Sequence, residues 1–355
     1  MAILELLWEK GRPSEASIEL MAEGKTVRIR LIRAVFRRHR KVAEKHGLYF
    51  FIDSSRTRLS RRLMDVVEEL GPDHVICEAR IPWFIARHIS RTSGAKLILR
   101  PHKIELMDLP SLMHDKLTAP AWANGMTIYT ALLAHLSDWT LSLALPDEQL
   151  LRSFLISRVT TIEPSYAPMP RGSDEERLAR LVEEKSPFFL AYEPSHLYVK
   201  LAKTIKDVNF LMVGATSDEL VKMLGIPREH MPNNIMAIGY VFGAELSTLF
   251  RNALALLIPQ RAFSGACMRL IEGLAHGVPI LTTTDVANKV VGLESGTHLL
   301  VEDDYRRWPR LLRELVRDDE LRDLLSRGAE TFYREKLRPL VHGQRLEAVL
   351  RRISS

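Results

Sequence analysis

Residues Pro259–Thr283, PQRAFSGACMRLIEGLAHGVPILTT, decide the fold that this sequence predicts. The segment starts at the end of one apolar run and finishes within another, and each run has the length of a buried strand. Between the runs, a loop reaches Ser264-Gly265, where we expect a helix to begin, and Gly277 closes that helix. Because a strand, a crossover helix and a second strand form a βαβ unit, the segment predicts a parallel sheet covered by helices.

The same alternation of short apolar runs and helical patterns continues along most of the chain. The expected strands are Thr26–Ile32, Leu48–Asp53, His74–Glu78, Lys96–Arg100, Trp139–Leu143, Val159–Glu163, Phe188–Tyr192, Asn209–Ala215, Ile235–Val241, Leu254–Pro259, Val278–Thr283 and His298–Glu302. The expected helices are Arg33–His46, Ser60–Leu70, Pro82–Thr92, one within Ser111–Leu136, Leu197–Ile205, Asp218–Leu224, Ala244–Ala253, Ala266–His276, Asn288–Glu294, and, after Asp303, Arg306–Arg317, Glu320–Lys336 and Val341–Ile353.

The length of the chain favours two domains, since 355 residues exceed the roughly 100–200 of one domain. A proline-rich and then charged stretch, Pro164–Pro187, predicts the passage between them. We therefore expect an α/β protein with Rossmann-like, doubly wound parallel-sheet domains at residues 1–170 and 171–336. A C-terminal helix is expected at 337–355, and its return to the first domain is left open. Ligands bind beyond the carboxyl ends of strands in such sheets, so the expected site faces a cleft between the domains.

Several classes of protein are excluded by what the sequence lacks. No apolar run approaches the roughly 18–20 residues of a membrane-spanning helix, and the N-terminal segment does not resemble a secretory signal, so we expect a cytoplasmic protein. Cys77 and Cys267 are expected to be small buried side chains. No Asp-x-Asp, His-Glu-x-x-His, Gly-x-Gly-x-x-Gly or Gly-x-x-x-x-Gly-Lys motif occurs. We therefore expect neither a metal nor another cofactor.

Positive charge is concentrated in one segment, Lys25–Arg62, which holds thirteen Lys and Arg residues against Glu44 and Asp53. Two interpretations remain open: solvated helix faces, or a surface for anionic lipid headgroups or another polyanion. Under the second, the protein is peripheral at the inner face of a membrane. We expect no nucleic-acid partner, because no zinc-finger, RRM-like or helix-turn-helix pattern accompanies the segment.

Two charged residues, Arg269 and Glu272, share one face of the helix expected after Ser264-Gly265, because they are three positions apart. A cation near a helix N-terminus is unfavourable unless an anion lies there too, and a diphosphate fits both the cation and the free N–H groups. Glu272, which only accepts hydrogen bonds when ionised, suits a pair of ribose hydroxyls. From the pair alone, an ordinary surface salt bridge stays an alternative.

A wider stretch resembles a known family. The run Ile238-Gly239-Tyr240-Val241, Glu245–Ala253, Leu256–Pro259 and Ser264 through Pro279 resembles the C-terminal domain of family 4 glycosyltransferases, which are retaining nucleotide-sugar enzymes of the GT-B fold. The later segments Gly296–Asp304 and Arg317–Arg322 look like that family's next strand, acidic loop and helix pair. The resemblance spans about Phe188 to Lys336.

The resemblance implies roles for particular residues on the donor side. Glu272 would hold the ribose, and Arg269 would neutralise the diphosphate and serve catalysis. The other donor-binding residues would be Gly214, Ser264, Gly265 and Ala266, with the last two offering backbone N–H groups. Two departures are clear: Ser264 stands where the family often has a first Glu, and Glu193-Pro194-Ser195-His196 replaces the usual Gly-Arg pair. Lys200 and Lys203 are candidates to replace that pair.

The first half of the chain has a weaker parallel. Leu99-Arg100-Pro101-His102-Lys103-Ile104-Glu105 resembles a segment, Arg-x-His-Asn-x-Glu, found in some members. The resemblance implies that Arg100, His102 and Glu105 lie on the acceptor side, with His102 catalytic or in contact with the acceptor. A structural histidine is the alternative. The start of the chain departs most, because Glu9–Ser17 offers only Gly11 where the family has a glycine-rich turn.

The function implied by the resemblance is transfer of a sugar from a nucleotide-sugar donor to a hydroxyl of a glycan or lipid-linked acceptor. The enzyme would be a metal-independent, retaining transferase of the hexosyltransferase type. Two other functions remain open: a GT-B nucleotide-sugar epimerase, and a non-catalytic nucleotide-sugar-binding protein.

Overall fold

A computed structural model of the chain describes residues 3–8, 17–22, 25–30, 67–68, 71–78, 83–108, 119–168, 182–192, 194–241, 243–261 and 263–354, the first three ranges by their backbone. The described residues form two compact units. Unit 1 consists of Met1–Glu163, Ala262–Ala266 and Gln344–Ser355. Unit 2 consists of Pro164–Arg261 and Cys267–Gly343. The first change of unit therefore falls between Glu163 and Pro164.

Unit 1 contains a seven-stranded sheet with the order β3-β2-β1-β4-β5-β6-β7. Its strands are β1 Ile3–Trp8, β2 Ser17–Ala22, β3 Lys25–Arg30, β4 His74–Glu78, β5 Lys96–Arg100, β6 Trp139–Ser142 and β7 Val159–Thr161. Strands β1 and β4 to β7 pair in parallel, as expected. The pairs β1–β2 and β2–β3 are antiparallel, so this edge of the sheet is a meander that the sequence pattern did not predict.

Helices pack on both faces of this sheet. They are α4 Trp83–Ser93, the 3₁₀ turn η1 Glu105–Asp108, α6 Ala119–His135 and α7 Leu145–Ser153. Val75, Cys77, Leu97 and Leu99 share one core with buried side chains of α4 and α6. On the other side, Ile76, Ile98, Leu141 and Ile162 pack with Leu350 of α16, Pro339–Ser354. Helix α16 thus supplies apolar cover for the face that α4 and α6 leave.

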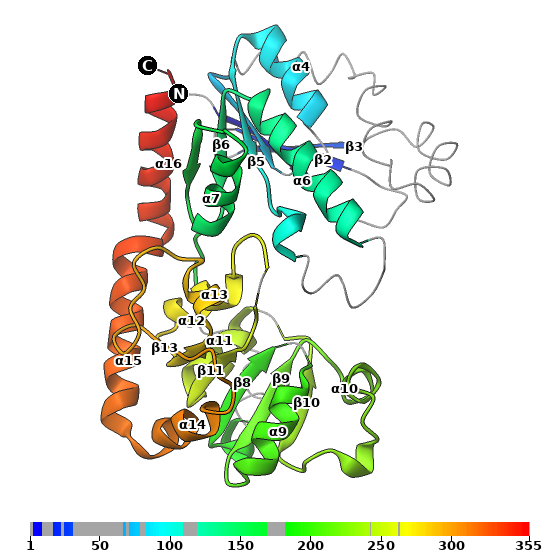
Figure 1. Ribbon diagram of the computed structural model, residues 1–355. Helices are drawn as coiled ribbons and strands as arrows, with labels where there is room; N and C mark the ends of the chain where they lie inside the picture. Colours follow the sequence, from blue (N-terminus) through cyan, green and yellow to red (C-terminus); the bar gives the residue numbers. More distant parts are fainter. Residues whose placement is uncertain are drawn as a thin grey trace. The chain divides into compact units, whose positions relative to one another are not determined.

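Unit 2 contains a six-stranded parallel sheet with the order β10-β9-β8-β11-β12-β13 (Figure 1). Its strands are β8 Phe188–Tyr192, β9 Asn209–Val213, β10 Ile235–Gly239, β11 Ala255–Ile258, β12 Ile280–Thr282 and β13 Leu300–Val301. Numbered from β8, this is the order 3-2-1-4-5-6 of a Rossmann sheet. The direction of winding reverses between β8 and β11, and ligands bind at that switch point, beyond the carboxyl ends of the strands.

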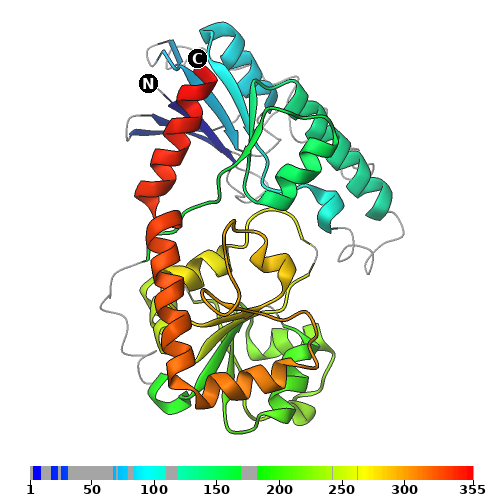
Figure 2. The ribbon, with the colours of Figure 1, turned by 60° about the vertical axis from the view of Figure 1, so that its left-hand side comes forward.

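The helices of unit 2 are α9 His196–Thr204, α10 Ser217–Leu224, η3 Arg228–His230, α11 Gly243–Asn252, α12 Met268–Ala275, α13 Thr284–Ala287, α14 Trp308–Arg317 and α15 Asp319–Phe332, followed by a π turn, Tyr333–Leu337. The orange helices α14 and α15 pack on other helices, α14 on α9 and α15 on α12 (Figure 2). Gly273 lets α12 approach the sheet closely, because a Cβ there would lie 2.8 Å from Leu256 Cδ2 of β11.

Most predicted strands agree with the structure within two residues, but one helix prediction is wrong. The predicted helix Asn288–Glu294 is absent, and the helical turn lies earlier, at Thr284–Ala287. The predicted helix Ala266–His276 agrees with α12 within two residues, and Gly265 lies outside the helix because its φ of +76° is one that no right-handed helix accommodates. The predicted elements Arg33–His46 and Leu48–Asp53 lie outside the described residues, as does most of Ser60–Leu70 and of the basic segment Lys25–Arg62.

Both cysteines, Cys77 and Cys267, are buried and neither forms a disulfide, which confirms their expected character. Among the helices of the described residues, none is both long enough and apolar enough to cross a bilayer.

Candidate functional site

The switch point of unit 2 brings together one aromatic and two charged side chains. Tyr192 is the last residue of β8, and Arg269 and Glu272 lie on α12, which follows β11. The guanidinium carbon of Arg269 lies 5.1 Å from the centroid of the Tyr192 ring, within the range of a cation–π interaction. The expected pair Arg269 and Glu272 therefore occupies the place where a sheet of this order binds its ligand. Sequence reasoning missed Tyr192, although it ends a predicted strand.

Burial governs the electrostatics of this group. It raises the pKa of Glu272 above the usual value for glutamate, while Arg269 nearby favours the ionised form. Burial also raises the pKa of Tyr192; Glu272 raises it further and Arg269 lowers it. The Tyr192 hydroxyl is buried and has no hydrogen-bond partner among the described residues. The side chains of Arg269, Tyr192 and Glu272 are thus close enough to influence one another's charge.

His276 anchors the end of α12. Its Nδ1 lies 2.8 Å from the carbonyl oxygen of Glu272 and its Nε2 lies 2.9 Å from Ser247 Oγ. Burial lowers the pKa of His276, which favours the neutral ring. Because a carbonyl only accepts, the Nδ1–H donates to the Glu272 carbonyl. The ring also stacks on Phe250, with centroids 4.9 Å apart, so the turn that carries Glu272 is held from α11.

The other donor-side residues of unit 2 have separate roles. Gly214 follows β9, and its N–H donates to the Gly239 carbonyl at 2.8 Å. Ser195, in the stretch that replaces the family's Gly-Arg pair, caps α9 by accepting from the Leu197 N–H at 3.2 Å. Lys200 and Lys203 are exposed on α9, and Lys203 lies in its last turn, about 10 Å from the carboxyl edge where α9 begins.

A second polar group lies at the carboxyl ends of β4 and β5 in unit 1. Glu78, the last residue of β4, is 4% exposed. One of its carboxylate oxygens accepts from Arg100 Nη1 at 2.9 Å and the other lies 2.6 Å from His102 Nε2. Arg100 and His102 are expected site residues, and Glu78, which sequence reasoning missed, joins them. It fixes the His102 ring, whose side chain is about half exposed.

Ser264 and Gly265 belong to unit 1, where two carboxylates occupy their N–H groups. The Ser264 N–H donates to Asp108 Oδ1 at 2.8 Å, and its hydroxyl donates to Asp108 Oδ2 at 3.0 Å. The Gly265 N–H donates to Asp147 Oδ2 at 2.7 Å. This corrects the expectation that Gly265 offers its N–H to a donor phosphate, because that group already has an anionic partner. Helix α12 itself begins three residues later, at Met268, next to Arg269.

The same segment lies directly on the backbone of His102. A Cβ added at Gly265 would clash with the His102 carbonyl oxygen. Asp108 ends η1, and its Oδ2 also lies 3.8 Å from Lys103 Nζ. Glu105, at the start of η1, is buried, so it is not exposed to an acceptor. The structure therefore brings the expected residues Ser264, Gly265 and His102 together, and leaves Glu105 beneath the surface. Ala266 is partly exposed in the loop before α12.

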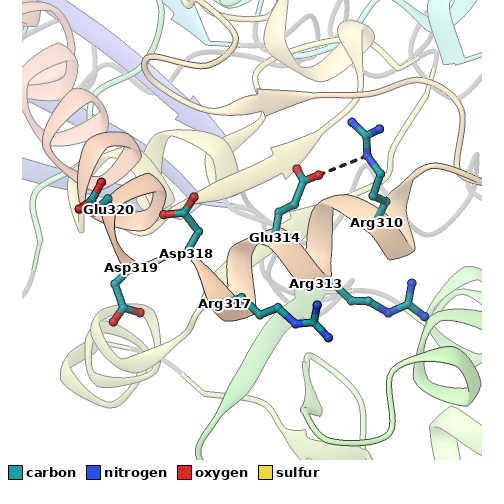
Figure 3. Close-up of a pocket in the computed structure, with 7 residues that line it drawn as sticks. All are labelled: Arg310, Arg313, Glu314, Arg317, Asp318, Asp319 and Glu320. Atoms are coloured by element: carbon teal, nitrogen blue, oxygen red, sulfur yellow. Dashed lines mark ion pairs between the residues drawn. The ribbon is translucent and has the colours of Figure 1, made fainter.

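For two other kinds of site, the described residues provide a surface cavity but no metal centre. No group of three or more His, Cys, Asp and Glu side chains in that part of the chain is arranged to hold a metal ion. A surface cavity of about 630 Å³ is lined by charged residues of α14 and α15: Arg310, Arg313, Glu314, Arg317, Asp318, Asp319 and Glu320 (Figure 3). Arg310 pairs with Glu314 at 3.2 Å, and Asp318 caps α15. No expected site residue lines this cavity.

Solved structures with the same fold are remote in sequence. HepE of Anabaena in complex with UDP-glucose is 13% identical, with 82% of each chain covered and a TM-score of 0.63. The sucrose-phosphate synthase of Thermosynechococcus elongatus is 11% identical, with 82% of this chain and 76% of that chain covered and a TM-score of 0.63. A mutant of TarM of S. aureus, in complex with fondaparinux, alpha-GlcNAc-glycerol and UDP, is 12% identical, with 99% of this chain and 76% of that chain covered and a TM-score of 0.59.

These similarities define the fold as GT-B, the fold of glycosyltransferases with two α/β units. Within the chain, residues 178–318 match the family described as Glycosyl transferases group 1. The matched residues include β8 to β13 and α12, and therefore Tyr192, Arg269 and Glu272. A comparison with curated protein sequences finds no match.

Proposed function

We propose that the protein transfers a sugar, of hexosyl type, from a nucleotide-sugar donor to a hydroxyl group of a glycan or lipid-linked acceptor, with retention of anomeric configuration. The observation that carries the proposal is the group of Arg269, Tyr192 and Glu272 at the switch point of unit 2, within the segment that matches the glycosyltransferase family. UDP-glucose is the first donor to test, because HepE binds it.

On the donor side, Arg269 stabilises the negative charge that develops on the leaving diphosphate, together with the N–H groups at the start of α12. The Tyr192 ring holds the guanidinium group of Arg269 in place through a cation–π contact. Glu272, when ionised, accepts hydrogen bonds from the two ribose hydroxyls. No metal ion takes part in this proposal, because the charge of the diphosphate is balanced by the protein itself.

On the acceptor side, His102 contacts the acceptor hydroxyl and exchanges a proton with it. Glu78 accepts from His102 Nε2, which leaves Nδ1 of that ring for the acceptor. Arg100 holds the other oxygen of the same carboxylate, so Glu78 cannot rotate away from His102. A lipid-linked acceptor would fit a cytoplasmic enzyme that associates with the inner face of a membrane through the basic segment Lys25–Arg62.

The test measures release of free nucleoside diphosphate from a panel of nucleotide sugars, with and without acceptor mixtures, in buffer containing EDTA. We expect release that depends on acceptor, and a loss of at least about a hundredfold in turnover for Arg269→Ala. Arg228→Ala is the matched control, because Arg228 is an exposed arginine of the same unit, on η3.

Other outcomes distinguish the rival functions. Release of an altered sugar without acceptor would identify an epimerase. Thermal stabilisation by a nucleotide sugar without any turnover would identify a binding protein, for which the replacement of the family's first Glu by Ser264 already argues. Normal transfer by Arg269→Ala would contradict the assignment of the donor site.

A further inference from the structure

Helix α6 exposes a row of large apolar side chains. Ile128 is 60% exposed, Leu132 51%, Leu136 44% and Trp122 43%. Ile128, Leu132 and Leu136 are spaced four residues apart, so they form one stripe along the helix and its end. The opposite side of α6 is buried in the core of unit 1, through side chains such as Met126, Leu133 and Ala134. The exposed stripe is therefore additional to the face that stabilises the fold.

The exposed side of α6 also lacks charge. Ala119–His135 contains no Asp, Glu, Lys or Arg, and the remaining exposed positions are Ala121, Asn124, Gly125 and His135. A surface helix of a soluble protein normally carries charged residues on its outer face. An uncharged outer face with a tryptophan, in contrast, suits the boundary between water and a lipid bilayer.

Leu155 adds another exposed apolar side chain to this surface, beyond the end of α6. His135 Nε2 lies 2.9 Å from the Phe154 carbonyl oxygen, which places the turn after α7 next to the end of α6. In that turn Leu155 has φ +63° and is 86% exposed. A leucine in this conformation is strained, and the strained residue holds its side chain in solvent.

Positive charge borders the apolar surface on helix α4, which contacts the residues directly after α6. Trp83 Nε1 donates to Ser137 Oγ at 2.9 Å, and Arg87 Nη1 donates to the Leu136 carbonyl at 2.6 Å. Helix α4 carries Arg87, His88 and Arg91 and contains no acidic residue. Helix α6 thus supplies apolar side chains and α4 supplies cations, and neither helix contains a carboxylate.

We propose that this surface, the outer side of α6 with Leu155 and the cations of α4, binds an anionic lipid bilayer, with α6 lying parallel to the membrane plane. Leu and Ile side chains gain by leaving water, and the α4 arginines are attracted to anionic headgroups. A second copy of the chain fits less well, because neither helix supplies a carboxylate to pair with the α4 cations of the other copy. The proposal does not depend on the donor chemistry.

Co-sedimentation of the full chain with vesicles tests the proposal. One set of vesicles is phosphatidylcholine alone, and the other contains about one-third phosphatidylglycerol. We expect binding to the anionic vesicles that weakens with salt, and a decrease of at least about tenfold in the partition coefficient for the double variant Ile128→Glu/Leu132→Glu. Met223→Glu is the matched control, because Met223 is 63% exposed on α10 of unit 2 and should bind as the wild type does.

Tryptophan fluorescence gives an independent measurement. Brominated lipids should quench the wild type, and Trp122→Phe should lose part of that quenching, since Trp83 and Trp308 are buried and Trp139 is partly buried. Three results would overturn the proposal: no binding of the wild type to either vesicle, equal binding of the double variant and the wild type, or a dimer in solution that the double variant converts to a monomer. Equal binding would assign membrane association to the segment Lys25–Arg62 alone. None of these results involves nucleotide sugars, so they are separate from failure of the proposed function.

Discussion

The guanidinium group of Arg269 lies over the ring of Tyr192, 5.1 Å from its centroid, and so joins the first turn of α12 to the carboxyl end of β8. These two elements flank the point where the winding of the unit 2 sheet reverses. A cation at the start of a helix is electrostatically unfavourable in the absence of an anion. The Tyr192 ring offsets part of that cost, because its face is a region of negative potential.

Removing the ring should weaken donor binding. Because a cation–π contact contributes about 0.5–2 kcal/mol, we expect Tyr192→Ala to raise the KM for the donor roughly twofold to thirtyfold. Tyr192→Phe keeps the ring and should stay near the wild type, since the Tyr192 hydroxyl has no hydrogen-bond partner among the described residues. Steady-state kinetics with saturating acceptor measures both variants. Tyr240→Ala, at an exposed tyrosine of unit 2, controls for the loss of a tyrosine elsewhere. Equal KM values for Tyr192→Ala and the wild type would exclude this role.

As the pH is lowered, nucleoside diphosphate binding should begin to weaken at a higher pH than it would if Glu272 had the ordinary pKa of a glutamate. Burial raises the pKa of Glu272, and only the ionised carboxylate can accept from both ribose hydroxyls. The Kd for UDP should therefore increase as the pH falls through this raised pKa. Calorimetric titrations between about pH 4.5 and pH 8 measure the change. Glu272→Gln should bind weakly with little dependence on pH, whereas Glu229→Gln, on η3, should follow the wild type. A pH-independent Kd for the wild type would remove Glu272 from the site.

The same pKa shift has the opposite sign for stability. A glutamate whose pKa is higher in the folded than in the unfolded state stabilises the fold below the unfolded pKa, and this contribution is lost as the pH rises through the folded pKa. At neutral pH the ionised Glu272 therefore destabilises unit 2 relative to a neutral side chain. We expect Glu272→Gln to have a higher Tm than the wild type at pH 7, and the difference to shrink toward pH 4. A lower Tm at pH 7 would show that Arg269 outweighs the cost of burial.

Much of the fold could be predicted because buried parallel strands leave a local signal. The bounds of β4, β5 and β8 agree with the predicted strands to the residue, since each is an apolar run between polar turns. The meander of β1 to β3 was not predicted, because no helices separate these strands and the alternation of strands and helices is therefore absent there. The start of α12 was predicted two residues early, at Ala266 instead of Met268, and the left-handed conformation of Gly265 left no signal beyond the glycine itself.

The candidate site was predictable only where its residues are neighbours in sequence. Arg269 and Glu272 could be paired because they are three positions apart on one helix. Tyr192 and Glu78 were missed because their contacts, with Arg269 and His102, join distant parts of the chain. Each of them ends a predicted strand, and the rule that ligands lie at the carboxyl ends of parallel strands was the signal that could have identified them. Asp108 and Asp147 had no comparable signal.

A side chain at Gly265 should destabilise the segment that carries Ser264. Gly265 has φ +76°, and a Cβ there would clash with the His102 carbonyl oxygen. Gly296 has φ +84° with no atom within 4 Å of such a Cβ, so Gly296→Ala measures the conformational cost alone. We expect Gly265→Ala to lower the free energy of unfolding by about 1–3 kcal/mol more than Gly296→Ala does, in urea titrations. Equal effects of the two substitutions would mean that the contact with His102 relaxes without cost.

Glu78 should act as a positioning residue for His102. Its carboxylate lies 2.6 Å from His102 Nε2 and is held from its other oxygen by Arg100. Glu78→Gln keeps the shape of the side chain but removes the charge, so His102 loses its anionic partner, and one buried oxygen is replaced by an amide. We expect kcat to fall about tenfold to a hundredfold while the KM for the donor stays unchanged, because the proposed donor site consists of residues of unit 2.

The pH dependence of kcat separates positioning from general destabilisation. If Glu78 acts through His102, Glu78→Gln shifts the pH profile of kcat. In a chain that already carries His102→Ala, Glu78→Gln should change kcat no further, because the partner on which Glu78 acts is absent. Glu148→Gln is the matched control, because Glu148 also pairs with an arginine of unit 1, Arg152 at 2.8 Å, while its other oxygen accepts from the Thr161 hydroxyl. A loss of kcat in Glu78→Gln with an unchanged pH profile and a lower Tm would mean that the carboxylate only supports the ends of β4 and β5.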